Sequence, residues 1–283
     1  MYLRPRTLDE ALGALAATGA QVLAGGTDVF PALGDRPQAR PFLDISALPE
    51  LRGISMAPDH VRIGAATTWT EVARADLPRG FDALRAAARE VGSIQIQNRG
   101  TVAGNLCNAS PAADGVPPLI ALDAEVELAS RAGIRRLPLA AFISGYRRTE
   151  RREDEIVTAV LVPHAMTDAR SAFLKLGARR YLVISIVMVA AMLRTDETGR
   201  IGAARVAVGS CSAVAQRLPA LEAALIGKPA AAGIGTAVEA AHLAPLSPID
   251  DVRATGAYRA DAAQTLVARA LEACVRDVAK EAA

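Results

Sequence analysis

The sequence predicts an α+β protein built from two parts. At 283 residues, the chain is long enough for one large domain or two modest ones. Beyond a polar, turn-like segment at residues 164–170, strand patterns come first and helix patterns follow, which is typical of an α+β domain. We therefore expect an N-terminal domain over residues 1–168 and a C-terminal domain over residues 169–283.

The expected C-terminal domain is a three-stranded antiparallel sheet with three helices. Apolar runs predict the strands, and a polar turn joins the last two of them. The strands are expected at residues 172–176, 183–193 and 201–208, and the helices at 218–225, 233–242 and 261–278.

The N-terminal part mixes short helices with short strands. Thr7 is placed to cap a helix, Glu10 to complete a capping box and Gly19 to end that helix. Thr70 is expected to cap a second helix, and an alanine-rich segment at residues 81–91 forms a third. Strands are expected at 21–24, 42–45, 53–56, 60–63, 125–128, 134–137 and 155–162, with 53–56 and 60–63 forming a hairpin.

Composition excludes several classes of protein. The chain is 51% hydrophobic, yet no run reaches the roughly 18–20 apolar residues that a membrane span needs. A net charge of +2 with both signs interspersed argues against nucleic acid as the main partner. Cys107, Cys211 and Cys274 are too widely spaced for a cluster site, and the N-terminus has no apolar signal segment, so we expect a reduced, cytoplasmic protein.

Two glycine-centred segments point to phosphate chemistry. The first runs from Ala24 to Asp28 and the second from Thr101 to Asn105. Glycine lets the backbone approach an anion and aim successive N–H groups at it, and Thr or Asn side chains add donors. Neither segment is a Gly-x-Gly-x-x-Gly or P-loop fingerprint. The alternative is that both are ordinary tight turns, because Gly, Asn and Asp dominate turns.

The second segment carries a resemblance to a known family. Residues 101–114 are similar to the signature Thr-(Ile/Val)-(Gly/Ala)-Gly-Asn, three residues, (Ala/Gly)-(Ser/Asp)-Pro, two residues and Asp. That signature belongs to the FAD-binding medium subunit of the molybdenum hydroxylases, which include carbon monoxide, xanthine and nicotine dehydrogenases. The similarity extends over almost the whole chain, through residues 23–29, 64–69, 175–180, 251–253 and 258–259.

The resemblance implies a fold and a function. The fold is a two-part FAD-binding domain of the vanillyl-alcohol-oxidase and CO-dehydrogenase-flavoprotein type, followed by the C-terminal domain described above. The function is that of an oxidoreductase subunit that passes electrons from 2Fe-2S clusters to an acceptor such as NAD. A large molybdenum-cofactor (molybdopterin) subunit and a small 2Fe-2S subunit would be its partners, in a heterotrimer or a dimer of heterotrimers.

The resemblance also implies roles for particular residues. Thr27, Thr101 and Asn105 are expected as donors to the diphosphate, Asp114 as acceptor from the ribityl hydroxyls, and Lys175 as a positive charge near the flavin ring. The alternatives that the residues leave open are a turn or capping aspartate for Asp114 and a solvated strand lysine for Lys175. The full expected FAD-binding set is Leu23, Ala24, Gly25, Gly26, Thr27, Asp28, Val29, Val91, Ile96, Gly100, Thr101, Ala103, Gly104, Asn105, Cys107, Asn108, Ala113, Asp114, Val157, Lys175, Tyr181 and Ile184.

Some of these positions carry specific expectations. Many relatives have glycine at Ala103, so we expect a negative φ there, because a left-handed alanine costs roughly 1–2 kcal/mol. Cys107 is expected to be a small wall residue and Tyr181 a stacking candidate. Replacing Gly25 or Gly104 by Val is expected to abolish flavin retention without unfolding the chain, because the side chain would fill the place of the diphosphate. The arginines of residues 147–152 are expected in a solvated loop or at a subunit contact.

The positions of the histidines argue against a metal site and against a covalently linked flavin. His60, His164 and His242 share no metal-ligand spacing and lie outside both glycine segments, so we expect non-covalent FAD and no metal. Two other functions stay open at this point. One is a self-contained FAD-dependent oxidoreductase of similar fold, which would need a catalytic acid or base over the flavin. The other is a non-catalytic nucleotide-binding scaffold.

Overall fold

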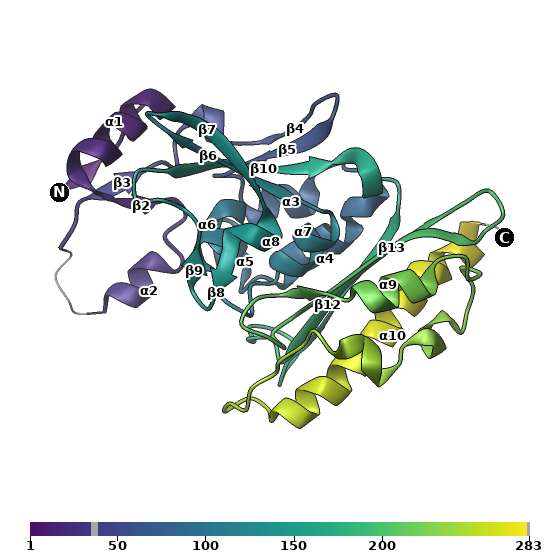
Figure 1. The fold of residues 1–283 in the computed structure, drawn as a ribbon. Helices are drawn as coiled ribbons and strands as arrows, with labels where there is room; N and C mark the ends of the chain where they lie inside the picture. The colour runs from purple at the N-terminus through teal and green to yellow at the C-terminus, as the bar shows by residue number, and fades with distance from the viewer. Residues whose placement is uncertain (35–38, 282–283) are drawn as a thin grey trace.

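The computed structural model describes residues 1–34 and 39–281, with side chains described as far as residue 276. Its described strands form a parallel sheet and an antiparallel sheet in the N-terminal part, a second antiparallel sheet in the C-terminal part, and one small hairpin (Figure 1). The predicted α+β class is confirmed. No helix among the described residues has both the length and the apolar character needed to cross a membrane.

A small parallel sheet opens the chain. It has the order β1-β3-β2, so β2 is an edge strand. Helix α1 (Leu8–Thr18) packs on it through Ala11, Leu12 and Leu15, and α2 (Val29–Leu33) follows β2. The strands are β1 (Tyr2–Leu3), β2 (Gln21–Leu23) and β3 (Phe42–Asp44), and the last two agree with the expected ones.

The two predicted helix caps differ in detail. Thr7 caps α1 by accepting from the N–H of Glu10, but the Glu10 carboxylate accepts from the N–H of Arg6 rather than closing the box. Thr68, not Thr70, caps α3 (Trp69–Arg74), and it forms a full capping box with Glu71. A bridge between Thr68 and Thr101 fixes the chain at this point and moves the helix start two residues earlier than expected.

A five-stranded antiparallel sheet in the order β4-β5-β10-β6-β7 forms the centre of the N-terminal part. The predicted hairpin of residues 53–63 is confirmed, and the strands expected at 125–128 and 134–137 pair as a second hairpin. The strands are β4 (Ile54–Met56), β5 (His60–Gly64), β6 (Glu125–Ser130), β7 (Gly133–Pro138) and β10 (Ile156–Pro163). A separate hairpin joins β8 (Ile143–Gly145) and β9 (Arg148–Thr149).

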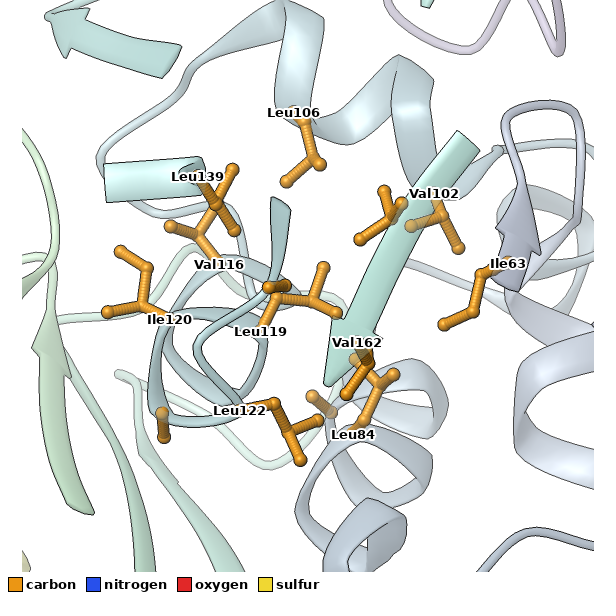
Figure 2. Packing of buried hydrophobic residues seen from close by; sticks show 14 of the residues in the cluster. Ile63, Leu84, Val102, Leu106, Val116, Leu119, Ile120, Leu122, Leu139 and Val162 are labelled. Atoms are coloured by element: carbon orange, nitrogen blue, oxygen red, sulfur yellow. The ribbon is translucent and has the colours of Figure 1, made fainter. Parts of the chain in front are cut away.

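Short helices cover this sheet and fill the main core. Figure 2 shows Val102 and Leu106 of α6 among the same side chains as Leu119 of α7 and Val162 of β10. Because α6 buries this face, its N-terminus is held in place against the sheet. The helices are α4 (Asp82–Glu90), α5 (Ile94–Gln97), α6 (Val102–Asn108), α7 (Val116–Ala121) and α8 (Leu139–Phe142), with 3-10 turns at Pro49–Leu51, Arg79–Phe81 and His164–Met166.

The C-terminal part is a four-stranded antiparallel sheet in the order β11-β12-β13-β14. The predicted three strands are present, and a two-residue strand too short to predict is added at the edge. The strands are β11 (Arg170–Leu176), β12 (Val187–Thr195), β13 (Ile201–Gly209) and β14 (Gln216–Arg217).

The three expected C-terminal helices are only partly regular. Helix α9 (Pro219–Leu225) agrees with the prediction, and α10 (Gly256–Glu281) begins earlier than expected because Thr255 accepts from the N–H of Tyr258. The helix expected at 233–242 is two 3-10 turns, Ile234–Ala237 and Ala240–Leu243, separated by the extended backbone of Val238 and Glu239.

Both faces of the C-terminal sheet are buried. On β12, Val187, Val189 and Ala191 belong to the core formed with α9 and α10, whereas Met188 and Ala190 belong to the core of the N-terminal helices. Alternate side chains of a strand point to opposite faces, and both faces are buried here, so the sequence of this strand is a continuous apolar run. The sheet therefore lies between α4 and α7 on one side and α10 on the other (Figure 1).

Candidate functional site

A cavity of about 960 Å³ lies where the first glycine segment, the N-terminus of α6 and the start of β10 meet. This volume is at the upper end of the roughly 300–1,000 Å³ typical of small-molecule sites. Sixteen of the twenty-two expected residues line it, namely Ala24, Gly25, Gly26, Thr27, Asp28, Val29, Val91, Ile96, Gly100, Thr101, Ala103, Gly104, Asn105, Cys107, Asn108 and Val157.

The first glycine segment presents a row of free backbone donors. Among the described residues, the N–H groups of Gly25 to Val29 have no hydrogen-bond partner. Gly26 has a φ of +75°, a left-handed conformation that turns the backbone between β2 and α2. Five consecutive unpaired amides beside a cavity are the arrangement in which backbone nests bind anions.

The second glycine segment is the N-terminus of α6 rather than a loop, and its amides are already paired. The N–H of Val102 donates to the carbonyl of Thr67, that of Ala103 to Ala65, and that of Gly104 to Oγ1 of Thr101. These amides are therefore not available to a diphosphate as expected. Ala103 has the negative φ that was predicted, because it lies inside the helix.

Side chains of the second segment remain available. Thr101 is the N-cap of α6, and its hydroxyl accepts from Gly104 and can still donate its own proton. Oδ1 of Asn105, an acceptor, is buried and has no partner among the described residues, so the donor that this side chain can offer to a diphosphate is its Nδ2 group. Both residues line the cavity. This wall therefore provides side-chain donors, whereas the opposite wall, at residues 25–29, provides backbone N–H donors.

Gly25 lies against Arg99 and Gly100, just before the second glycine segment, and Gly104 lies against Thr101 of its own segment. A Cβ built on Gly25 would lie 1.9 Å from the carbonyl oxygen of Arg99, and one on Gly104 would lie 2.8 Å from Oγ1 of Thr101. Clashes with protein atoms are therefore expected at both positions, in addition to the predicted effect on flavin retention. A side chain there collides with the protein itself before it reaches the cavity.

Asp114 and Lys175 pair with each other instead of lining the cavity. The Lys175 ammonium is 2.8 Å from Oδ2 of Asp114 and also donates to the carbonyl of Glu90, while Ser185 donates to Oδ1 of Asp114. Burial raises the pKa of the Asp114 carboxyl above its ordinary value, although Lys175 and Ser185 oppose the shift. The pair joins the N-terminal part to β11 and to the segment before β12.

Four other expected residues also lie outside the cavity lining. Leu23 and Ala113 are buried. Tyr181 is 68% exposed, with the guanidinium of Arg180 5.2 Å from its ring centre, and Ile184 is 52% exposed. The strand expected to begin at residue 183 begins at Val187, so Ile184 stands on an irregular segment and not on a buried strand.

Cys107 opens onto the cavity while protein atoms surround it closely. The residue is exposed to the cavity, but the surrounding protein atoms desolvate the thiol and raise its pKa to about 11. This agrees with the expected wall residue, because a thiol with a raised pKa is a poor nucleophile.

The cavity also includes residues that sequence reasoning missed. Val22, Arg147 and Arg151 line it, and so does Trp69, although that side chain is almost fully buried. Arg147 was expected in a solvated loop. The β8–β9 hairpin brings it to the cavity, and a pairing of two such short strands leaves no clear pattern in a sequence.

Two family models match this chain. The model described as the FAD binding domain in molybdopterin dehydrogenase matches residues 1–165. The model described as the CO dehydrogenase flavoprotein C-terminal domain matches residues 172–274.

Relatives and solved structures agree with these models. The chain is 33% identical over 279 residues to a putative xanthine dehydrogenase FAD-binding subunit of Escherichia coli K12, covering 97% of this chain and 95% of the relative. It is 36% identical over 206 residues to the nicotinate dehydrogenase FAD-subunit of Eubacterium barkeri, covering 70% of each. Carbon monoxide dehydrogenase of Hydrogenophaga pseudoflava aligns with a TM-score of 0.87 and 29% identity over 96% of both chains. The chain therefore belongs to the FAD-binding flavoprotein family of the molybdopterin dehydrogenases and is an oxidoreductase subunit of that family.

Proposed function

We propose that this chain carries non-covalent FAD and transfers electrons within a multi-subunit molybdenum hydroxylase. Electrons would arrive from 2Fe-2S clusters in a small partner subunit and leave to an external acceptor such as NAD. A large partner would hold the molybdenum cofactor and the substrate. Relatives named as subunits of xanthine, nicotinate and carbon monoxide dehydrogenases support this division.

The observation that carries the proposal is the row of amides from Gly25 to Val29, which have no hydrogen-bond partner in the part of the chain that the structure describes. A diphosphate needs several donors at close range, and backbone amides provide them without the entropy cost of long side chains. Thr101 and Asn105 would add side-chain donors from the opposite wall. The sixteen expected residues that line the cavity are the ones we assign to the cofactor.

The open edge of β2 fits the adenine half of the dinucleotide. The N–H of Gln21 and the carbonyl of Leu23 bond to the β3 side of the parallel ladder. Val22 lies between them, so its N–H and C=O point away from β3, toward the free edge. Val22 lines the cavity, and one donor beside one acceptor matches the amidine edge of adenine.

Asp114 and Lys175 are assigned a supporting role at the same site. Lys175 donates to the carbonyl of Glu90, and the next residue, Val91, is part of the cavity wall. The pair would fix the end of α4, and with it this wall. We place the boundary between the two domains at residues 168 and 169.

The histidine positions favour a non-covalent cofactor. His60, His164 and His242 are the three histidines of the chain, and none of them lines the cavity. Bound FAD would accept electrons one at a time and release two together. We further propose a cytoplasmic heterotrimer, or a dimer of heterotrimers.

The visible absorption spectrum of the purified chain tests the proposal. We expect a flavin spectrum, either as purified or after incubation with FAD, and release of intact FAD on denaturation. The chain alone should show no turnover of purine, nicotinate or carbon monoxide. A protein that stays colourless with FAD would contradict the cofactor assignment, and substrate turnover by the isolated chain would favour a self-contained oxidoreductase.

A further inference from the structure

A carboxylate stands among the free amides of the first glycine segment. Asp28 is exposed and lines the cavity, and the unpaired N–H groups lie on both sides of it along the chain. Asp28 occupies the N-cap position of α2, but its side chain makes no capping hydrogen bond. A negative charge here would repel a bound diphosphate unless other groups compensate it.

A chain of two hydrogen bonds leads from this carboxylate to an arginine. Nδ2 of Asn108 donates to Oδ1 of Asp28 at 2.8 Å. Nη1 of Arg147 donates to Oδ1 of the same asparagine at 2.6 Å. All three residues line the cavity, and they come from the first segment, the end of α6 and the β8–β9 turn.

The backbone at Arg147 is held in an uncommon conformation. Its φ is +51°, a region that non-glycine residues rarely occupy. Its N–H donates to the carbonyl of Ala109 at 2.9 Å, and Ala109, the C-cap of α6, is itself left-handed with a φ of +47°. Two left-handed residues thus fasten the turn to the helix end, and Arg147 lies where its side chain reaches Asn108.

We propose that Arg147 is a positioning residue which, through Asn108, holds the Asp28 carboxylate away from the anion site. The proposal rests on the proposed function, since it requires a phosphate ligand at residues 25–29. Asn108 suits the intermediate position because its amide donates to the carboxylate while its carbonyl accepts from the guanidinium. Arg147 therefore acts on the ligand through Asp28 and not by direct contact.

Charge arithmetic gives the size of the effect. At an effective dielectric constant near 20, a carboxylate that moves to within several ångströms of a diphosphate weakens its binding by about tenfold or more. The effect depends on Asp28 being charged. When Asp28 is uncharged, replacing Arg147 should therefore have little effect on the affinity for FAD.

The test is a double-mutant cycle on FAD affinity, measured by quenching of flavin fluorescence. We expect Arg147→Met to weaken FAD binding at least about tenfold when Asp28 is present, and less than about threefold in the Asp28→Asn background. Arg147→Lys should keep most of the affinity. Arg148→Met is the matched control, because Arg148 is exposed, lies one residue further on and does not line the cavity. It should leave the affinity within twofold.

Two outcomes would overturn the inference while leaving the function intact. An equal loss in both backgrounds would mean that Arg147 contacts the ligand directly or only holds the turn, and unchanged affinity in Arg147→Met would mean that it has no role. Thermal unfolding of each variant shows whether the β8–β9 turn stays folded. Failure of the wild-type chain to bind FAD would instead overturn the proposed function, and the inference with it.

Discussion

Gly25 and Arg99 are in contact so close that no side chain fits between them. A Cβ on Gly25 would lie 1.9 Å from the Arg99 carbonyl oxygen and 3.0 Å from the N of Gly100. Gly25 and Arg99 are far apart in the chain, and their contact fixes the first glycine segment against the residues that lead into α6. The first segment therefore stabilises the fold as well as forming the anion site that we propose.

We expect Gly25→Val to lower stability as well as FAD retention. The new side chain meets backbone atoms, which cannot rotate aside, so the cost should reach about 1–3 kcal/mol or more. Urea unfolding of the cofactor-free protein measures this cost. Gly13→Ala is the control, since nothing lies within 4 Å of that position and alanine favours a helix. A Gly25→Val protein with wild-type stability that loses only FAD would support the simpler idea that the side chain fills the ligand's place.

The sequence predicts the sheets well because the strands bury apolar runs. Strands β5, β6, β10, β12 and β13 all lie where those runs occur. Their order along the chain also separates the mixed N-terminal part from the C-terminal sheet. Strand β14, with two residues, and the broken helix near Gly235 carry too few periodic positions to be recognised.

Contacts between residues that are far apart in the sequence limit how much of the site can be predicted. The glycines predict an anion-binding loop. The local sequence does not show that the N–H groups of Val102 and Ala103 donate to the carbonyls of Thr67 and Ala65. Asp28 and Asn108 are 80 positions apart, and only the folded chain brings them together. Local chemistry therefore predicts which segments form the site, and the tertiary fold decides which atoms remain free.

Cys107 should report on the cavity. Because burial raises its thiol pKa to about 11, only about a thousandth of it is thiolate at pH 8, and labelling with a disulfide reagent should be slow and accelerate as the pH rises toward 11. Cys211 and Cys274 are buried and should react only after unfolding. FAD should protect Cys107, and Cys107→Ser should abolish the native-state reaction. Rapid labelling at pH 7 would contradict the raised pKa.

The edge of β2 should discriminate between purines. If the Val22 N–H donates to N1 of adenine and its C=O accepts from the 6-amino group, hypoxanthine reverses both partners. Each unpaired group costs about 1–3 kcal/mol. The hypoxanthine analogue of FAD should therefore bind at least tenfold more weakly than FAD, and the 7-deazaadenine analogue within about threefold. Equal affinities for all three dinucleotides would show that the base is not read by Val22.

Removing one partner of the buried Asp114–Lys175 pair should lower the free energy of unfolding. Both side chains are less than 10% exposed, at 8% and 7%. Lys175→Met leaves an uncompensated carboxylate, so we expect a loss of about 3–5 kcal/mol in the free energy of unfolding at pH 8. Adding Asp114→Asn should recover much of it, because no buried charge then remains.

The pH dependence of the Lys175→Met variant follows from the same carboxylate. Burial already raises the pKa of Asp114, and loss of the ammonium removes an opposing influence, so the pKa should rise further. A raised carboxyl pKa means that the folded state holds the proton more tightly than the unfolded state. The variant's deficit should therefore be largest above the folded pKa and shrink as the pH falls through it. Urea unfolding at pH 5 and pH 8 measures the difference, and a deficit that stays constant or grows toward pH 5 would contradict the assignment.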